Sequence, residues 1–268
     1  MIAMAFGALL AKSWCVDSTL RVYLCGSVAI ERGDRLVRDS ALAGPQGRLL
    51  FVFLMSRSPQ PVSKTDLIHA LWGSSAPPSA DTALNAVISK LRRVLRTVDV
   101  DEPDGILSDA GTYRLAMASS WVDVDVARTA ADRAEGAVRR GDLADAWSNA
   151  NVAAAIARQP FLPDESRLWV QRQREMLARV WRRAALVLSQ VSTRNQEYEL
   201  GIQHAWEVTQ DEPFDELACQ ALMKAHAAAG NRAEALRVYA RCRKLFRDEL
   251  GAEPSEQTAN VFLSILRT

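Results

Sequence analysis

The stretch SADTALNAVISKLRRVLRT, residues 79–97, has the periodicity of an amphipathic helix. Its aliphatic residues recur three and four positions apart, so at 100° per residue they share one face. They are Leu84, Ile88, Leu91 and Leu95, with Val87 and Val94 at the edges of that face. The stretch holds four basic residues and one acidic residue, a local net charge of +3 in a chain whose total is +1. One face therefore packs, and the other is exposed and cationic.

The exposed face of residues 79–97 orders its side chains in a way that suits duplex DNA. Short hydroxyl and amide groups, which can hydrogen-bond base edges, come before most of the cations, which suit phosphates. The expected base contacts are Thr82, Asn85, Ser89 and Lys90. An isolated basic helix is more often just a solvated surface, so this interpretation depends on the neighbouring elements.

The segments before residue 79 predict a small sheet and two helices. Residues 20–30 alternate as a strand interrupted at Gly26, and residues 32–34 form a turn before another extended piece. A helix should begin at residue 44 and end before Pro59, because proline disfavours helix in the residue before it. Ser63 is a candidate N-terminal cap for a short helix that ends at Gly73. Ser79 is a candidate N-terminal cap for the amphipathic helix at residues 79–97.

A hairpin follows the cationic helix. Residues 106–108 and 112–115 alternate as strands around a turn at residues 109–111. Three helices and a hairpin after a sheet predict a winged helix-turn-helix, which places its last helix in the major groove of DNA. The expected phosphate contacts are Lys64, Arg92, Arg93, Arg96 and Arg114.

The chain changes character near residue 121, where strand signals vanish and Ala, Leu, Arg and Glu recur with helical spacing. The expected domains are residues 20–118, a winged helix, and residues 122–268, an all-helical domain. The second domain has a 34-residue period, the tetratricopeptide length. The paired positions are Leu188 and Leu222, Gln196 and Gly230, Gly201 and Ala235, Ala205 and Tyr239, and Val208 and Cys242. Residues 141–146 indicate a third, more distant helix pair, with an insertion around residues 160–183.

These features predict a mainly α protein: a winged helix-turn-helix with a small β-sheet and a wing hairpin, followed by an all-α, tetratricopeptide-like domain. Most tryptophans are expected to pack in helices, with Trp121 between the domains. The basic run Arg172, Arg174, Arg179, Arg182 and Arg183 is expected to be the solvated face of a long helix.

Composition excludes several other classes of protein. The 268 residues are 49% hydrophobic and 24% charged, as in an ordinary globular protein of two domains. The apolar run at residues 2–11 is too short to span a bilayer and lacks a basic leader, which favours a flexible or mis-assigned N-terminal extension and a cytoplasmic location. The cysteines and histidines show no metal-ligand spacing and no catalytic setting, so we expect no metal, no cofactor and no enzyme activity.

Several motifs occur in one order along the chain. They are VSKTDLIHALWG at 62–73, the helix at 84–95, YRL at 113–115, GNRAEALRVY at 230–239 and ELGAEPS at 249–255. Over roughly residues 20–266 the chain resembles the Streptomyces antibiotic regulatory protein family of transcription activators, which join an OmpR-like winged helix to a bacterial transcriptional activator domain. It departs from the family pattern at Asp81, where a basic or neutral residue is commoner.

The resemblance implies particular partners: double-stranded DNA carrying direct repeats about one helical turn apart, RNA polymerase, and a second copy of the chain on DNA. Residues 20–118 carry 12 basic and 10 acidic residues, and residues 119–268 carry 20 and 21, so bulk charge cannot hold DNA. Binding must come from local placement and fall with salt. The alternative is a tetratricopeptide-type adaptor whose winged helix contacts protein instead of DNA.

Overall fold

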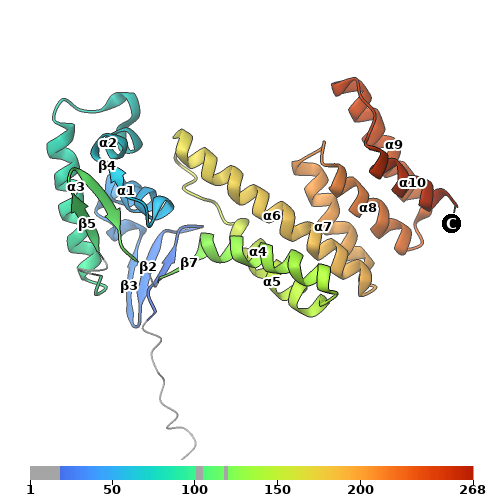
Figure 1. Cartoon of the computed structure of the whole chain (residues 1–268), viewed down its shortest axis with the longest axis horizontal. Coiled ribbons are helices and arrows are strands. Elements are labelled where there is room, and N and C mark those ends of the chain that lie inside the picture. Colours follow the sequence, from blue (N-terminus) through green and yellow to red (C-terminus); the bar gives the residue numbers. More distant parts are fainter. Residues whose placement is uncertain (1–18, 101–104, 118–119, 268) are drawn as a thin grey trace, which may run out of the picture. The chain divides into compact units, whose positions relative to one another are not determined.

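The computed structural model describes residues 19–100, 105–117 and 120–267, so the expectation for residues 2–11 lies outside the described residues. The chain forms two compact units, Met1–Asp123 and Val124–Thr268. The first combines two small sheets with three helices and the second is helical, which confirms the predicted fold class (Figure 1).

The three helices of the first unit are α1 (Gly44–Arg57), α2 (Lys64–Trp72) and α3 (Ala80–Arg96), close to the predicted bounds. Ser63 caps α2 as predicted, because its Oγ accepts the Asp66 N–H at 3.1 Å. The prediction that Ser79 caps α3 with its side chain is wrong. Ser79 precedes the helix, but its backbone is not extended (φ −102°, ψ 36°) and its side chain makes no capping hydrogen bond.

The aliphatic face of α3 is the part of the helix that holds it to the unit. Leu84, Ile88, Leu91 and Leu95 are at most 2% exposed and pack toward α1 and α2. Full burial of such a side chain is worth about 1.5–3 kcal/mol. The predicted division of α3 into a packed face and an exposed face is therefore confirmed.

Two sheets flank these helices. The first has the strand order β3 (Arg35–Arg38), β2 (Ala29–Arg32), β1 (Arg21–Tyr23) and β7 (Trp121–Val122), and β7 runs parallel to β1. The second has the order β4 (Val62–Ser63), β6 (Thr112–Leu115) and β5 (Ile106–Asp109). β5 and β6 form the predicted wing hairpin, whose turn residues Ala110 and Gly111 both have positive φ, as a two-residue turn of type I′ requires. Short 3-10 turns, η1 (Asp39–Ala41) and η2 (Gly73–Ser75), complete the unit.

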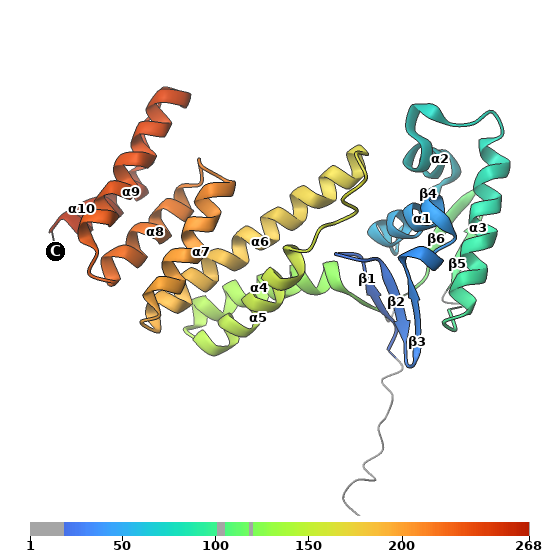
Figure 2. The same cartoon turned by 180° about the vertical axis from the view of Figure 1, so that it is seen from behind.

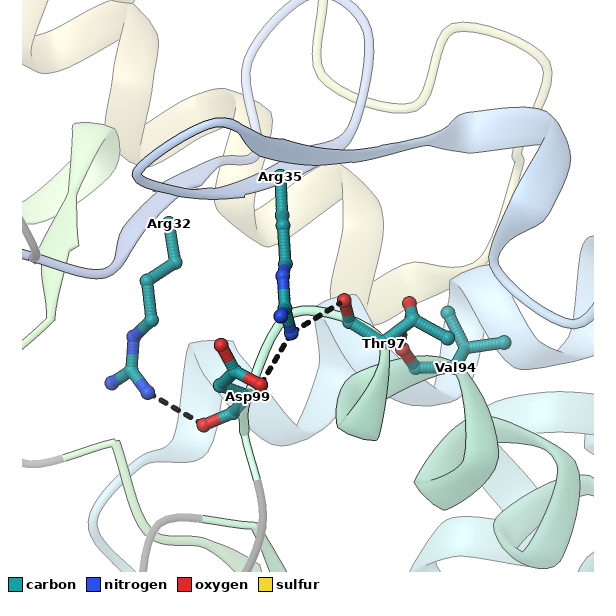
Figure 3. A network of polar contacts seen from close by, with 5 residues as sticks. All are labelled: Arg32, Arg35, Val94, Thr97 and Asp99. Atoms are coloured by element: carbon teal, nitrogen blue, oxygen red, sulfur yellow. Dashed lines mark hydrogen bonds and ion pairs between the residues drawn. The ribbon is translucent and has the colours of Figure 1, made fainter.

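The C-terminal end of α3 is fixed to the first sheet by two arginines on the β2–β3 hairpin (Figure 3). Arg32 donates to the backbone carbonyl of Asp99, and Arg35 donates to the Thr97 carbonyl and pairs with the Asp99 carboxylate. Cations beside the last carbonyls of a helix also complement its dipole. The helix is therefore held at its end as well as along its aliphatic face.

Asp123 closes the first sheet at the point where β7 ends. Its Oδ2 accepts the N–H groups of Leu24 and Cys25, each at 2.9 Å, and the side chain is 3% exposed. Trp121, two residues earlier, lies in β7 with its ring centroid 5.3 Å from that of Tyr23. A fragment that ended at residue 118 would lose both β7 and this carboxylate, so the first unit needs residues through Asp123.

The second unit consists of paired helices. They are α4 (Asp123–Arg140), α5 (Leu143–Ala157), α6 (Leu168–Arg194), α7 (Tyr198–Asp211), α8 (Glu216–Ala228), α9 (Arg232–Leu245), a π-helical turn η3 (Phe246–Leu250) and α10 (Glu256–Arg267). The 34-residue period is confirmed at the turns, because Gln196 between α6 and α7 and Gly230 between α8 and α9 share a left-handed backbone, with φ of 66° and 78°. Gly201 on α7 lies so close to α6 that an added Cβ would be 2.5 Å from Thr193 Oγ1.

The predicted insertion around residues 160–183 divides into a loop and the N-terminal part of the 27-residue helix α6. Arg174 binds that loop, donating to the carbonyls of Phe161 and Glu165 at 2.8 and 2.9 Å. Arg182 pairs with Asp215, and Arg183 with Asp132 and Glu135. The expectation of a solvated basic face is therefore wrong for these three arginines.

The tryptophans of the second unit divide into packed and exposed side chains. Trp181 is 7% exposed, with the Arg158 guanidinium 5.0 Å from its ring centroid. Trp147 and Trp206 are 50% and 51% exposed, so these two side chains do not pack in the core of the second unit. Helical periodicity is a less reliable guide to the buried face of a short helix when alanine occurs on both of its sides.

We expect Asp123→Ala to lower the free energy of unfolding of the first unit by about 2–4 kcal/mol, because it leaves two buried N–H groups without an acceptor. The measurement is the urea dependence of Cys25 alkylation in the intact chain, located by mass spectrometry, since Cys25 is buried beside Asp123. Asp125→Ala, at an exposed position two residues later, is the matched control. Equal midpoints for the two variants would contradict the assigned role.

Candidate nucleic-acid interface

The outer face of α3 carries the four expected base contacts. Thr82, Asn85, Ser89 and Lys90 are all exposed, and the first three lie along one ridge because they are three and four residues apart. At a rise of 1.5 Å per residue, the ridge from Thr82 to Ser89 is about 10 Å long. That length suits the major groove, which is about 12 Å wide.

The wing hairpin lies alongside α3 (Figure 2). Hydrogen bonds of Tyr113 and Arg92 join the hairpin to the helix. The first contact orients Asn85: the Tyr113 hydroxyl on β6 donates to Asn85 Oδ1 at 3.4 Å. The carbonyl oxygen of an amide can accept a second hydrogen bond, and its NH₂ group remains free to donate. Asn85 is therefore held in place while keeping the donor and acceptor that match an adenine edge.

The second contact involves Arg92, which was among the expected phosphate contacts. Its Nε and Nη2 donate to the Ile106 carbonyl on β5 at 3.1 and 2.9 Å, and Nη2 also lies 3.3 Å from Ser108 Oγ. A half-buried guanidinium with these acceptors fixes the wing against the helix. We therefore assign Arg92 to positioning the wing, in place of the expected phosphate contact.

Lys64 and Asp81 join the first turns of α2 and α3. Lys64 Nζ lies 3.1 Å from Asp81 Oδ1, and the Asp81 side chain is 68% exposed. A surface ion pair of this kind contributes about 0–1 kcal/mol. It does reduce the positive charge that Lys64 offers to a phosphate, and it gives the unusual acid at residue 81 a structural partner.

Four other cations surround the outer face of α3 and the wing. Lys90, Arg93, Arg96 and Arg114 are exposed, and none of them forms an ion pair within the part of the chain that the structure describes. Because cations this close to the ridge are uncompensated, they are the groups best placed to meet a nucleic-acid backbone. Three of them belong to α3 and one to β6, so the helix and the wing both present positive charge.

Sequence reasoning missed three residues that build this interface indirectly. Tyr113 belongs to the motif YRL at 113–115, but a tyrosine in a strand does not indicate that it orients an asparagine 28 residues away. Arg32 lies in a predicted turn and Arg35 directly follows it, and only the folded chain brings them to the end of α3.

Within residues 19–100, 105–117 and 120–267, no cluster of three or more His, Cys, Asp and Glu side chains is arranged to hold a metal ion. None of the described helices has both the length and the apolar character that crossing a bilayer demands.

Comparison with known protein families places the chain among bacterial transcription regulators. Residues 41–112 match the family described as "Transcriptional regulatory protein, C terminal", and residues 122–266 match the "Bacterial transcriptional activator domain". The second match alone covers more than half of the chain. The chain belongs to the Streptomyces antibiotic regulatory protein family of transcription activators, as its motifs predicted.

Individual relatives agree with this placement. Regulatory protein AfsR of Streptomyces griseus is 29% identical over 254 residues, which is 92% of this chain and 24% of that protein. AfsR of Streptomyces coelicolor is 31% identical over 246 residues, 89% of this chain and 23% of that protein. The chain thus spans less than a quarter of the length of these two relatives. Regulatory protein DnrI of Streptomyces peucetius is 26% identical over 243 residues, 82% of this chain and 83% of that protein.

A solved structure shares the fold. Mycobacterium tuberculosis EmbR, solved in complex with a low-affinity phosphopeptide, superposes with a TM-score of 0.83 over 92% of this chain and 65% of that chain. The two sequences are 22% identical, so the likeness concerns the fold alone.

Arg92 and Arg93 differ in a way that salt dependence can measure. We expect Arg93→Gln to weaken binding to every duplex that the unaltered protein binds. The variant should also reduce the slope of the logarithm of the binding constant against the logarithm of the salt concentration by about 1, because one phosphate contact is lost. Arg92→Gln should weaken binding with little change in slope, since it releases the wing from α3. The measurement is fluorescence anisotropy across a salt series. The same loss of slope in both variants would show that Arg92 also contacts phosphate.

Proposed function

We propose that this protein is a sequence-specific, DNA-binding transcription activator that acts in the cytoplasm. The observation that carries the proposal is the outer face of α3, where Thr82, Asn85 and Ser89 form an exposed ridge beside cations that have no ion pair in the described chain. A helix buried along one face and polar along the other can enter a major groove without exposing apolar surface.

Each side chain has a separate role in this proposal. Thr82, Asn85, Ser89 and Lys90 contact base edges, and Asn85 pairs with an adenine in the orientation that Tyr113 sets. Arg93 and Arg96 bind phosphates along the groove, and Arg114 on β6 binds the backbone beside the wing. Lys64 takes a minor part because Asp81 already neutralises it. No catalytic residue or cofactor enters the proposal.

Binding by a single copy should be modest, because few phosphates are neutralised and affinity falls steeply with salt. Two copies on direct repeats, about one helical turn apart, would lie on the same face of the duplex and support each other. The helical unit supplies the surfaces for this contact and for contact with RNA polymerase, since stacked helix pairs present extended binding surfaces.

The first test is selection from a random duplex library with the intact chain. Asn85→Ala and Ser89→Ala should each relax the preference at one base position, at a cost of about 1–3 kcal/mol there, because the base-edge hydrogen bonds are lost. His69→Ala, at an exposed position on α2, is the control and should leave the selected motif unchanged. If the unaltered protein enriches no motif, the proposal fails and an adaptor role for the winged helix gains support.

The second test concerns the arrangement of the two copies. On a duplex with two selected half-sites, we expect cooperative protection in footprinting when the repeats are direct and about one helical turn apart. Adding about half a helical turn between them should abolish cooperativity, and adding a full turn should restore the shared face. Protection of a single half-site, or a preference for inverted repeats, would contradict this arrangement.

A further inference from the structure

The second unit contains a groove that the proposed DNA contacts do not use. It has a volume of about 510 Å³ and is lined by α4, α6 and α8, the first helices of the three pairs. That volume falls within the range of about 300–1,000 Å³ that is typical of sites for small ligands. The groove can therefore hold a few side chains of one segment but not a folded domain.

The floor of the groove is apolar. It is formed by Leu186, Val187, Leu217 and Ala221. Leu217 is 53% exposed, which is unusual for a leucine in the first turn of a helix that packs on its neighbours. An occupant that covered this leucine would gain from burying it, by about 25 cal/mol for each Å² removed from water. The floor thus suits an apolar side chain.

One end of the groove is electrically compensated. Arg182 forms two hydrogen bonds with the Asp215 carboxylate, whose side chain is 5% exposed. Arg183 Nε is 2.7 Å from Glu135 Oε1, and its Nη2 is 2.6 Å from Asp132 Oδ1. These two arginines hold the walls together, and because carboxylates already neutralise them, they offer no free positive charge to a long polyanion.

The other end of the groove is cationic and uncompensated. Arg194 on α6 and Lys224 on α8 are both exposed, and neither forms an ion pair in the described part of the chain. Gln190 also lines the groove, is exposed and can form hydrogen bonds with an amide group. Residues 119–268 carry 20 basic and 21 acidic residues, so the positive charge at this end of the groove is local and not part of a general excess of basic residues.

We infer that the groove binds a short peptide segment of a partner protein, one that carries carboxylates next to apolar side chains. The carboxylates meet Arg194 and Lys224, and an apolar side chain covers Leu217. The two free cations match a local cluster of acids, whereas the arginines at the far end are already paired and offer no free positive charge to a continuous polyanion such as DNA. The inference deepens the proposed function and rests on it for one point: the partner protein is one that an activator contacts while it is bound to DNA.

The test uses the intact chain and a displayed library of short random peptides. We expect enrichment of peptides that combine Asp or Glu with Leu, Ile or Phe. Arg194→Glu/Lys224→Glu should weaken these peptides about tenfold or more, and a peptide with lysine in place of its acids should bind that variant better than the unaltered protein. The matched control, Arg179→Glu/Lys244→Glu, makes the same charge change at exposed positions outside the groove and should leave affinity unchanged.

Several outcomes would overturn the inference. They are no enrichment, enrichment of peptides without acids, equal losses in the groove and control variants, or equally tight binding of a short single-stranded oligonucleotide. Duplex binding is measured on the same preparations and should be equal in both variants. If duplex selection fails but peptide binding depends on the groove, only the proposed function is contradicted. If duplex selection succeeds but peptide binding does not depend on the groove, only the inference about the groove is contradicted.

Discussion

The arrangement of the first unit depends on how α3 is held. Its aliphatic face is buried against α1 and α2, and its last turn is fixed by Arg32 and Arg35 from the β2–β3 hairpin. These contacts use one side and one end of the helix, so the remaining side can carry polar groups that stay in water. Any side chain that packed across the outer face would remove the surface on which the proposed base contacts depend.

The arginines near α3 show that position along a sequence does not determine what a cation does. Arg92 and Arg93 are adjacent, but one is bound to the β5 backbone and the other is exposed without an ion pair in the described chain. A guanidinium that already has good acceptors gains little from a phosphate, whereas a free one releases counterions when it binds. The proposed interface therefore contains cations that hold its elements together and cations that present charge.

Much of this architecture is accessible from sequence because it is local. The aliphatic spacing of residues 84–95 identifies the packed face of α3, and the 34-residue period places the equivalent turns at Gln196 and Gly230. What sequence could not supply depends on contacts between distant residues. Asp123 binds N–H groups 98 and 99 positions away, and β7 pairs with β1 across a similar distance. Likewise, Thr82, Asn85 and Ser89 follow from helical spacing, whereas the part played by Tyr113 requires the folded wing.

The long helix α6 changes what kind of repeat domain this is. Stacked helix pairs usually unfold piece by piece, because each pair contacts only its neighbours. Here Arg174 binds the loop before α6, Arg183 reaches the acids of α4, and Arg182 binds Asp215, which also caps the first turn of α8. Loosening any one pair disturbs contacts made by the same helix with another. The domain should therefore open as a single cooperative unit, with few partly unfolded forms for a protease to find.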